Sequence, residues 1–174
     1  YLNVLLGLYR IASGDDAYND LNDRITAFLV RQLSSSPIGL LQSYDGEVYP
    51  VDNCFVIGSL GLHQRAAGQD HGDTIDRWVN TVRERYMDPD TRLLVQAVDP
   101  WTGSACDDPR GSGTALGIVV LHYADRELAQ DLYAGLKSSL AKTWLGFGAV
   151  REYPEGIRGQ GDIDSGPVIF GYGF

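Results

Sequence analysis

Apolar residues fall into two kinds of segment along the chain. Residues 114–124 are apolar on nearly every side of a helix, which is the pattern of a helix with neighbours all round it. Residues 128–144 differ, because an apolar residue recurs there at every fourth position from Leu128 to Trp144 and forms a single stripe. A similar stripe runs from Ile75 to Val82. The pattern therefore predicts buried helices that alternate with surface helices.

Short alternating stretches that end in turn residues follow the helix pairs. Three such turns occur, at Asp45-Gly46, at residues 99–103 (Asp-Pro-Trp-Thr-Gly) and at Pro154-Glu155-Gly156. Glycine next to Asp, or two residues after Pro, supplies the backbone angles that tight turns need. We therefore expect a short β-hairpin before each buried helix.

The sequence also repeats itself at an offset of 54 residues. Leu6-Gly7-Leu8 aligns with Leu60-Gly61-Leu62, and the register continues without a gap until Gln42 meets Gln96. Agreement of this kind is the signature of a repeated supersecondary unit. A third copy follows with small length changes. The units are approximately residues 1–52, 53–108 and 109–164, and a fourth begins at residues 165–174.

The repeated helical hairpins, with inner and outer helices in alternation and a β-hairpin before each inner helix, resemble the (α/α)6 toroid of the six-hairpin glycosidase superfamily. Linalool dehydratase-isomerase shares that fold. The resemblance covers essentially the whole chain and is architectural, so it transfers no catalytic residue. It implies an all-α toroid of helical hairpins. Three units make about half of such a ring, and Tyr1 and Phe174 would both lie inside inner helices. We expect the same polypeptide or a second copy to supply the remainder.

Composition and charge narrow the classes of function. The chain has 174 residues, of which 44% are apolar, so it can bury a core and is not disordered. Its formal charge of −9 has the wrong sign for neutralising phosphates or coating an anionic membrane. No apolar run approaches the roughly 18 residues that a membrane span needs. We therefore expect neither nucleic acid nor membrane among the partners.

An aspartate recurs where the chain enters each predicted inner helix, at Asp52, Asp108 and Asp164. On a ring these three carboxylates would face one mouth. Cleavage of a glycosidic bond needs two carboxyl groups, which inverting enzymes hold roughly 6.5–9.5 Å apart. We predict Asp164 as the general acid or base, with Asp108 or Asp52 as its partner. Asp164 is favoured because residues 161–167 combine two acids, a hydroxyl, two glycines and a proline.

Helix capping is the alternative interpretation of these aspartates. The Asp carboxylate is a favoured N-cap, because it accepts from free N–H groups and faces the positive end of the helix dipole. Three helix starts would then explain three aspartates without any chemistry. The tripeptide Asp164-Ser165-Gly166 also matches the aspartic-protease motif, but the second loop that such proteases need is absent from the sequence.

Aromatic and charged residues of the turns complete the predicted site. Tyr49, Trp101 and Tyr153 would stack on sugar rings, with Glu155 beside them. Arg110 would pair with a substrate acid or neutralise neighbouring carboxylates. These features predict a carbohydrate-active enzyme, a glycoside hydrolase acting on a small-molecule or oligosaccharide substrate. The alternatives are a non-catalytic repeat module that binds a glycan or a protein, and a lyase or isomerase on the same fold.

Neither a metal nor a cofactor is expected. His63, His71 and His122 lack the spacing of metal ligands, and the glycine clusters match neither the dinucleotide nor the phosphate-loop template. His63 and His122 fit structural histidines better than ligands. Cys54 and Cys106 leave three alternatives open: a disulfide, two thiols at the mouth as in terpenoid-processing relatives of the fold, or buried inert thiols.

Overall fold

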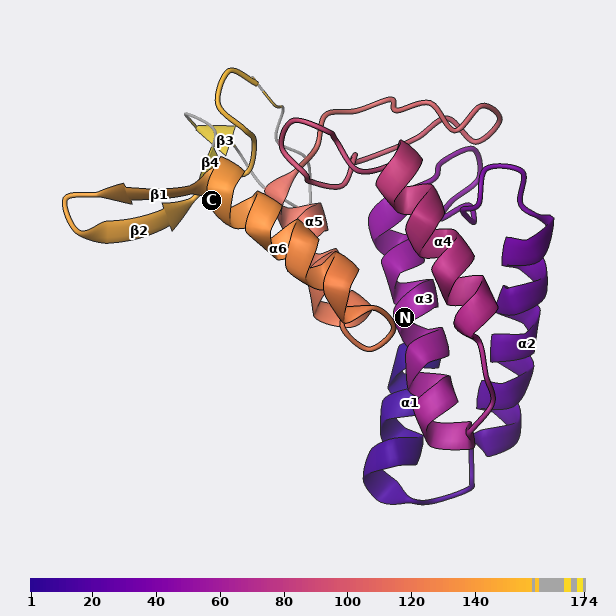
Figure 1. Ribbon diagram of the computed structural model, residues 1–174. Coiled ribbons are helices and arrows are strands. Elements are labelled where there is room, and N and C mark those ends of the chain that lie inside the picture. Colours follow the sequence, from indigo (N-terminus) through magenta and orange to yellow (C-terminus); the bar gives the residue numbers. More distant parts are fainter. Residues whose placement is uncertain (158, 160–167, 170–171, 174) are drawn as a thin grey trace.

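The chain folds into helices followed by two short antiparallel hairpins, described in a computed structural model over residues 1–157, 159, 168–169 and 172–173 (Figure 1). Mostly helical structure confirms the predicted all-α class. The elements are α1 (Leu2–Ser13), α2 (Asn19–Ser35), α3 (Pro50–Ala67), α4 (Gly72–Arg85), α5 (Gly111–Leu121), α6 (Arg126–Leu140), β1 (Ala141–Trp144), β2 (Phe147–Val150), β3 (Val168–Ile169) and β4 (Tyr172–Gly173).

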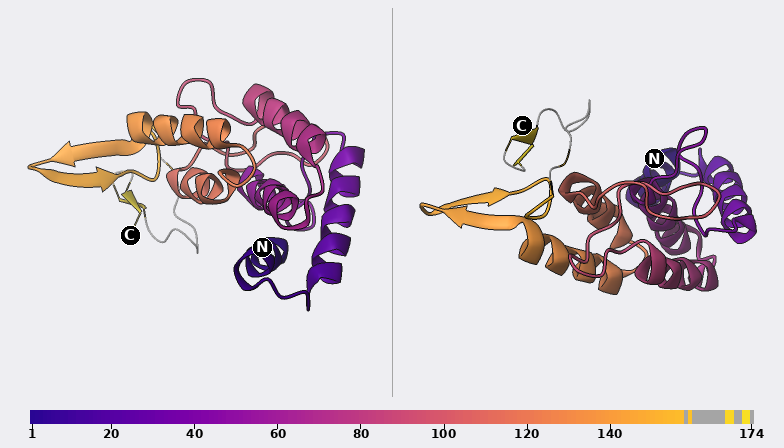
Figure 2. Two further views of the ribbon diagram at one scale, coloured as in Figure 1. Left: turned by 60° about the horizontal axis from the view of Figure 1, so that its bottom comes forward. Right: turned by 90° about the horizontal axis from the view of Figure 1, so that it is seen from above.

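The helices form two curved layers. In the inner layer α3 packs between α1 and α5, while α2, α4 and α6 lie outside them (Figure 2). The long loops that lead into α3 and α5 lie together along the top of Figure 1. Consecutive inner helices are joined through an outer helix that runs back, so the N-terminal ends of α3 and α5 share one end of the inner layer.

The offset of 54 residues places the same glycines at the same structural positions. A Cβ at Gly7 would lie 2.9 Å from Cβ of Leu62 on α3, and one at Gly61 would lie 2.3 Å from the carbonyl oxygen of Tyr123, just after α5. Gly14 and Gly68 end α1 and α3 in the left-handed conformation, which glycine adopts without strain. Glycine recurs where one inner helix approaches the next and where an inner helix ends.

The core centres on α3. Ile57 and Leu60 are fully buried and pack with residues of the outer helices such as Trp78, Val82 and Leu132. The loop before α3 is fixed to the outer layer, because the hydroxyl of the buried Tyr86 donates to the carbonyl oxygen of Ile38 at 2.6 Å. Burial of apolar surface of this kind is the main stabilising contribution in the chain.

The prediction that inner helices are buried on every side is correct for α3 and wrong for α1 and α5. Leu2 and Leu5 of α1 are 56% and 63% exposed, and Leu116 and Val119 of α5 are 45% and 60% exposed. The physical reason is position in the layer. α3 has an inner helix on both sides, whereas among the described residues α1 and α5 each have one.

Two predicted element boundaries are also wrong. The outer helix α6 ends at Leu140, and Trp144 lies in β1 instead. The β1–β2 hairpin, with a turn at Leu145-Gly146 where both residues have positive φ, was not predicted. The predicted turn at residues 154–156 is present, because the Ile157 N–H donates to the Pro154 carbonyl oxygen at 3.2 Å and Gly156 has a φ of 91°. In the predicted fourth unit, Val168–Ile169 pairs with Tyr172–Gly173 as two short strands, so these residues do not continue a helix.

The β1–β2 hairpin projects away from the helical layers (Figure 1). Its pairing runs from Ala141 opposite Val150 to Trp144 opposite Phe147. Leu145 and Phe147 are each 76% exposed. None of the described helices combines the length and the apolar character needed to cross a bilayer.

Candidate functional site

A cavity of about 450 Å³ lies at the N-terminal ends of α3 and α5. It is built from the residue before α1, the two long loops and the first turns of the two helices. The helix starts direct backbone N–H groups toward this region, which favours ligands with oxygen atoms. Its lining consists of Tyr1, Tyr44, Tyr49, Val51, Asp52, Gln96, Arg110, Ser112, Gly113 and Leu116.

Asp52 is the carboxylate of this cavity among the described residues. It lies in the first turn of α3, and the N-cap of that helix is Tyr49, without a side-chain capping bond. The Asp52 carboxylate instead accepts a hydrogen bond of 2.8 Å from the Tyr1 hydroxyl. Burial and this bond to Asp52 raise the pKa of Tyr1 to about 12, so its hydroxyl remains a donor. Side-chain capping therefore does not explain Asp52.

Tyr44 and Tyr49 form an aromatic wall of the cavity. Their ring centroids are 6.3 Å apart in an edge-to-face arrangement, which is a favourable geometry for aromatic pairs. The chain turns between them at Asp45-Gly46, as the turn signal predicted, with Tyr44 bridged to Glu47 and Gly46 at a φ of 77°. The Tyr49 hydroxyl donates to Glu47, and this bond and burial raise the pKa of Tyr49 to about 12.

Arg110 and Ser112 also line the cavity, and the Glu152 carboxylate accepts hydrogen bonds from both of them. Arg110 is buried and donates from Nε to the Glu152 carboxylate at 2.9 Å, while the Ser112 hydroxyl donates to the same carboxylate at 2.6 Å. The Ser112 backbone N–H also donates to it, so Glu152 satisfies an N–H group at the start of α5. Arg110 thus pairs with Glu152, a carboxylate 42 positions away in the sequence that was not among the neighbouring acids considered for it.

Sequence reasoning missed several residues of the cavity. Tyr1, Gln96 and Ser112 line it, and Glu152 supports it from behind. Gln96 had a signal, because the repeat aligns it with Gln42. Its side chain lies against the start of α5, where a Cβ at Gly113 would come within 2.8 Å of its Oε1. No sequence signal identified Tyr1 or Glu152.

The other predicted site residues that the structure describes lie outside this lining. Asp108 is exposed in the loop three residues before α5, so its place relative to the helix differs from that of Asp52. Trp101 is 84% exposed on its turn, and Glu155 is exposed and pairs with Lys142. Tyr153 is buried, with the Arg110 guanidinium 5.4 Å above its ring. Asp164, the favoured acid, lies outside the described residues.

The cysteines do not form a pair at the cavity. Both are free; Cys54 is fully buried on α3, and Cys106 is exposed in the loop before α5. Burial and the nearby Asp52 raise the pKa of the Cys54 thiol well above its usual range. Of the three alternatives, the buried and inert thiol therefore describes Cys54.

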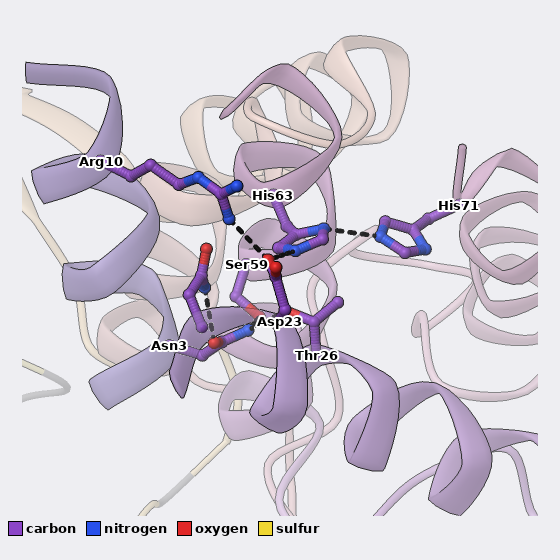
Figure 3. Close-up of polar contacts among 8 residues, drawn as sticks. Asn3, Arg10, Asp23, Thr26, Ser59, His63 and His71 are labelled. Atoms are coloured by element: carbon purple, nitrogen blue, oxygen red, sulfur yellow. Dashed lines mark hydrogen bonds and ion pairs between the residues drawn. The ribbon is translucent and has the colours of Figure 1, made fainter. Parts of the chain in front are cut away.

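A second polar cluster crosses the other end of the inner layer (Figure 3). His63 is fully buried, with Nε2 2.8 Å from the Asp23 carboxylate and Nδ1 2.9 Å from Nε2 of His71. Arg10 also pairs with Asp23. Because a carboxylate only accepts, His63 carries its proton on Nε2 and accepts from His71 on Nδ1. His63 is thus the structural histidine that was expected.

Among the described residues, no three His, Cys, Asp or Glu side chains come together in a way that could hold a metal ion. A scan of protein-family models gives no match to this sequence, and a search of curated proteins gives no relative either. The geometry of the cavity therefore carries the functional argument.

Proposed function

We propose that this protein is a carbohydrate-active enzyme of the glycoside hydrolase type and that the cavity around Asp52 binds its substrate. The single observation that carries the proposal is the lining of that cavity, which combines one carboxylate with aromatic rings and neutral hydrogen-bonding groups. Sugars present apolar C–H faces that stack on aromatic rings and hydroxyls that bond to carboxylates and amides.

In this proposal each side chain of the cavity has a separate role in catalysis or in substrate binding. Asp52 is the reacting carboxylate, oriented by the hydroxyl of Tyr1. Tyr44 and Tyr49 form the stacking wall, and Gln96 bonds to sugar hydroxyls. Cleavage with either stereochemical outcome requires a second carboxyl group. We assign that role to Asp164 or Asp108, each of which precedes an inner-helix start in the predicted repeat.

We further propose that the two curved layers are part of an (α/α) toroid. Support comes from the repeat and from the surfaces of the outermost inner helices. By the offset of 54 residues, Leu5 of α1 corresponds to Ser59 of α3, and Ser59 faces α1, where it accepts a hydrogen bond from Asn3. The exposed side of α1 is therefore the side that, on α3, receives a preceding inner helix.

A non-catalytic glycan-binding module is the second candidate. The observation that favours it is the presence of one carboxylate, Asp52, in the lining that the described residues provide. A single carboxylate with aromatic rings is enough to bind a sugar but not to cleave it by the two-carboxyl mechanism.

Substitution of the acid distinguishes the two candidates. Asp52→Asn preserves the size of the side chain and removes its charge, so we expect it to abolish turnover of a polysaccharide panel and to leave the fold unchanged. Asp73→Asn is the matched control, because Asp73 also lies in the first turn of a helix but is exposed and outside the cavity. Asp108→Asn and Asp164→Asn, assayed in parallel, identify the partner.

The outcomes separate clearly. Turnover that is lost in Asp52→Asn and kept in Asp73→Asn supports the hydrolase. Binding of an oligosaccharide without turnover in the unmodified protein, weakened by Tyr44→Ala, supports the binding module. Unchanged turnover in Asp52→Asn overturns the proposed role of the cavity.

A further inference from the structure

A second cavity, of about 430 Å³, lies at the far end of the inner layer from Asp52. Arg65, near the end of α3, and His122, just after α5, lie on one side of it, and the first two turns of α6 lie on the other. Asp52 and Arg65 are 13 positions apart on one helix, which separates their backbones by about 20 Å. The two cavities are therefore distinct.

The two charged side chains that line this second cavity are both basic. Arg65 and Arg126 contribute two permanent positive charges. Tyr133 and Gln130 add neutral polar groups, and no Asp or Glu is among the lining residues. In a chain with 23 acidic and 14 basic residues, a cavity of this composition departs strongly from the average.

Arg65 and Arg126 also lack the ion pairs that several other arginines of the chain make. Arg10 pairs with Asp23, Arg83 with Asp131 and Arg110 with Glu152, whereas neither Arg65 nor Arg126 has a carboxylate within ion-pair distance among the described residues. Two acids flank Arg126 in sequence, but the Asp125 carboxylate caps α6 through Leu128 and Glu127 faces Arg83. Neither of these two carboxylates forms an ion pair with Arg126.

Local contacts orient the basic groups. The Arg65 guanidinium lies 5.8 Å from the centroid of the Tyr123 ring, which favours its position over that ring. The His122 Nδ1–H donates to the Val119 carbonyl oxygen at 2.7 Å, which fixes the orientation of the imidazole ring. Ile118 and Ala129 add an apolar part to the lining.

We propose that this second cavity binds a small organic anion, with a carboxylate or phosphate group between Arg65 and Arg126 and an apolar body against Ile118, Ala129 and the Tyr133 ring. Arginine suits this role because its planar group donates two parallel hydrogen bonds to a carboxylate or phosphate. The site is independent of the Asp52 cavity, so it stands whether or not the protein cleaves sugars.

Calorimetric titration of the full chain with phenyl phosphate, benzoate and inorganic phosphate tests the proposal. Phenyl phosphate or benzoate should bind more tightly than inorganic phosphate, because only the aromatic probes use the apolar lining. Tighter binding of phenyl phosphate identifies a phosphate ligand, and tighter binding of benzoate identifies a carboxylate ligand.

Arg126→Gln and Arg65→Gln should each weaken binding about tenfold or more, since each removes charged hydrogen bonds. Arg31→Gln is the control, because Arg31 is exposed on α2 and the substitution changes the net charge equally. Equal weakening in the control would indicate general attraction and overturn the proposal. It is also overturned if the aromatic probes bind no better than inorganic phosphate, or if neither arginine variant weakens binding. Circular dichroism of each variant confirms that it is folded.

Discussion

Gly61 lies where α3 meets the end of α5, and the space there admits no side chain. A Cβ would lie 2.3 Å from the carbonyl oxygen of Tyr123 and 2.6 Å from Cα of Ala124. Both neighbours are backbone atoms, so relief requires the helices to move apart. The glycine of the repeated Leu-Gly-Leu motif is thus a requirement of helix contact.

We predict that Gly61→Ala destabilises the protein by about 1–3 kcal/mol or more, the usual range for overpacking. Gly148→Ala is the control, because a Cβ at Gly148, on the exposed β2 strand, meets no atom within 4 Å. The midpoints of urea unfolding compare the two variants. Equal midpoints for both would show that the helices can separate without loss.

The pair formed by the buried His63 and the half-buried His71 makes stability depend on pH. Burial, together with the nearby His63, lowers the pKa of His71. Burial acts to raise the pKa of Asp23, but hydrogen bonds from His63 and Arg10 outweigh that effect, so the pKa lies below its usual value. Both shifts mean that the unfolded chain takes up protons at a higher pH than the folded chain does. Stability is therefore lost on acidification.

We expect the free energy of unfolding to fall as the pH drops below about 6.5, the ordinary histidine pKa that applies to His71 in the unfolded chain. A second loss follows below about pH 4, where Asp23 of the unfolded chain is protonated. His71→Gln should flatten the first step, because the amide can still donate to His63 but does not titrate. His122→Gln is the control and should leave that step in place. Urea unfolding over this pH range would contradict the expectation if stability were constant or rose.

At the scale of single residues, the sequence was most informative where one physical requirement dominates. The Leu-Gly-Leu motif that revealed the repeat lies at close helix contacts, and Asp45-Gly46 marked a turn. Asp52 could be predicted in the first turn of a helix because it follows a turn and precedes an apolar segment. Tyr1 could not be predicted there, because its contact with Asp52 joins residues 51 positions apart in the sequence.

At the scale of elements, the sequence located the helices better than their ends. The apolar stripe of α6 continues to Trp144, yet the helix ends at Leu140 and β1 follows at once. Leu145-Gly146 adopts a turn that pairs β1 with β2, and this pairing competes with a further helical turn. Leu145 has no turn preference of its own, so only the pairing of the two strands reveals the boundary.

The start of α6 depends on one capping side chain. The Asp125 carboxylate accepts from the backbone N–H of Leu128 at 2.7 Å. We predict that Asp125→Ala lowers the free energy of unfolding by about 1 kcal/mol, because that N–H loses its partner. Asp125→Asn should retain most of the stability, since its side-chain oxygen can still accept. Thermal unfolding of both variants tests this; similar losses in the two would point to charge as the source.

At the scale of the whole molecule, the two outermost helices of the inner layer, α1 and α5, differ from the central helix α3. α3 is buried, whereas α1 and α5 expose apolar side chains on their outward sides. The sequence predicted apolar inner helices correctly but could not show that two of them lie at the margins of the layer. Apolar surfaces of this kind favour association with a complementary surface.

We predict that the protein self-associates through these margins. Leu5→Lys combined with Val119→Lys should shift the mass measured by light scattering toward the monomer, with little change in folding stability, because both side chains are more than half exposed. Asn80→Lys, on an exposed position of α4, is the control. A monomer at every concentration for the unmodified protein would refute the prediction.

The contacts of Glu152 should hold the protein together if a protease cuts the β1–β2 hairpin. Its carboxylate holds Arg110 and Ser112, and its carbonyl oxygen accepts from Gly111, while Arg151 donates to the carbonyl oxygen of Leu140. The projecting tip at Leu145-Gly146 is exposed and therefore accessible to a protease. A nick there should leave two fragments that co-elute in gel filtration and separate only in denaturant. The same tip is therefore a place to divide the gene into two complementing pieces.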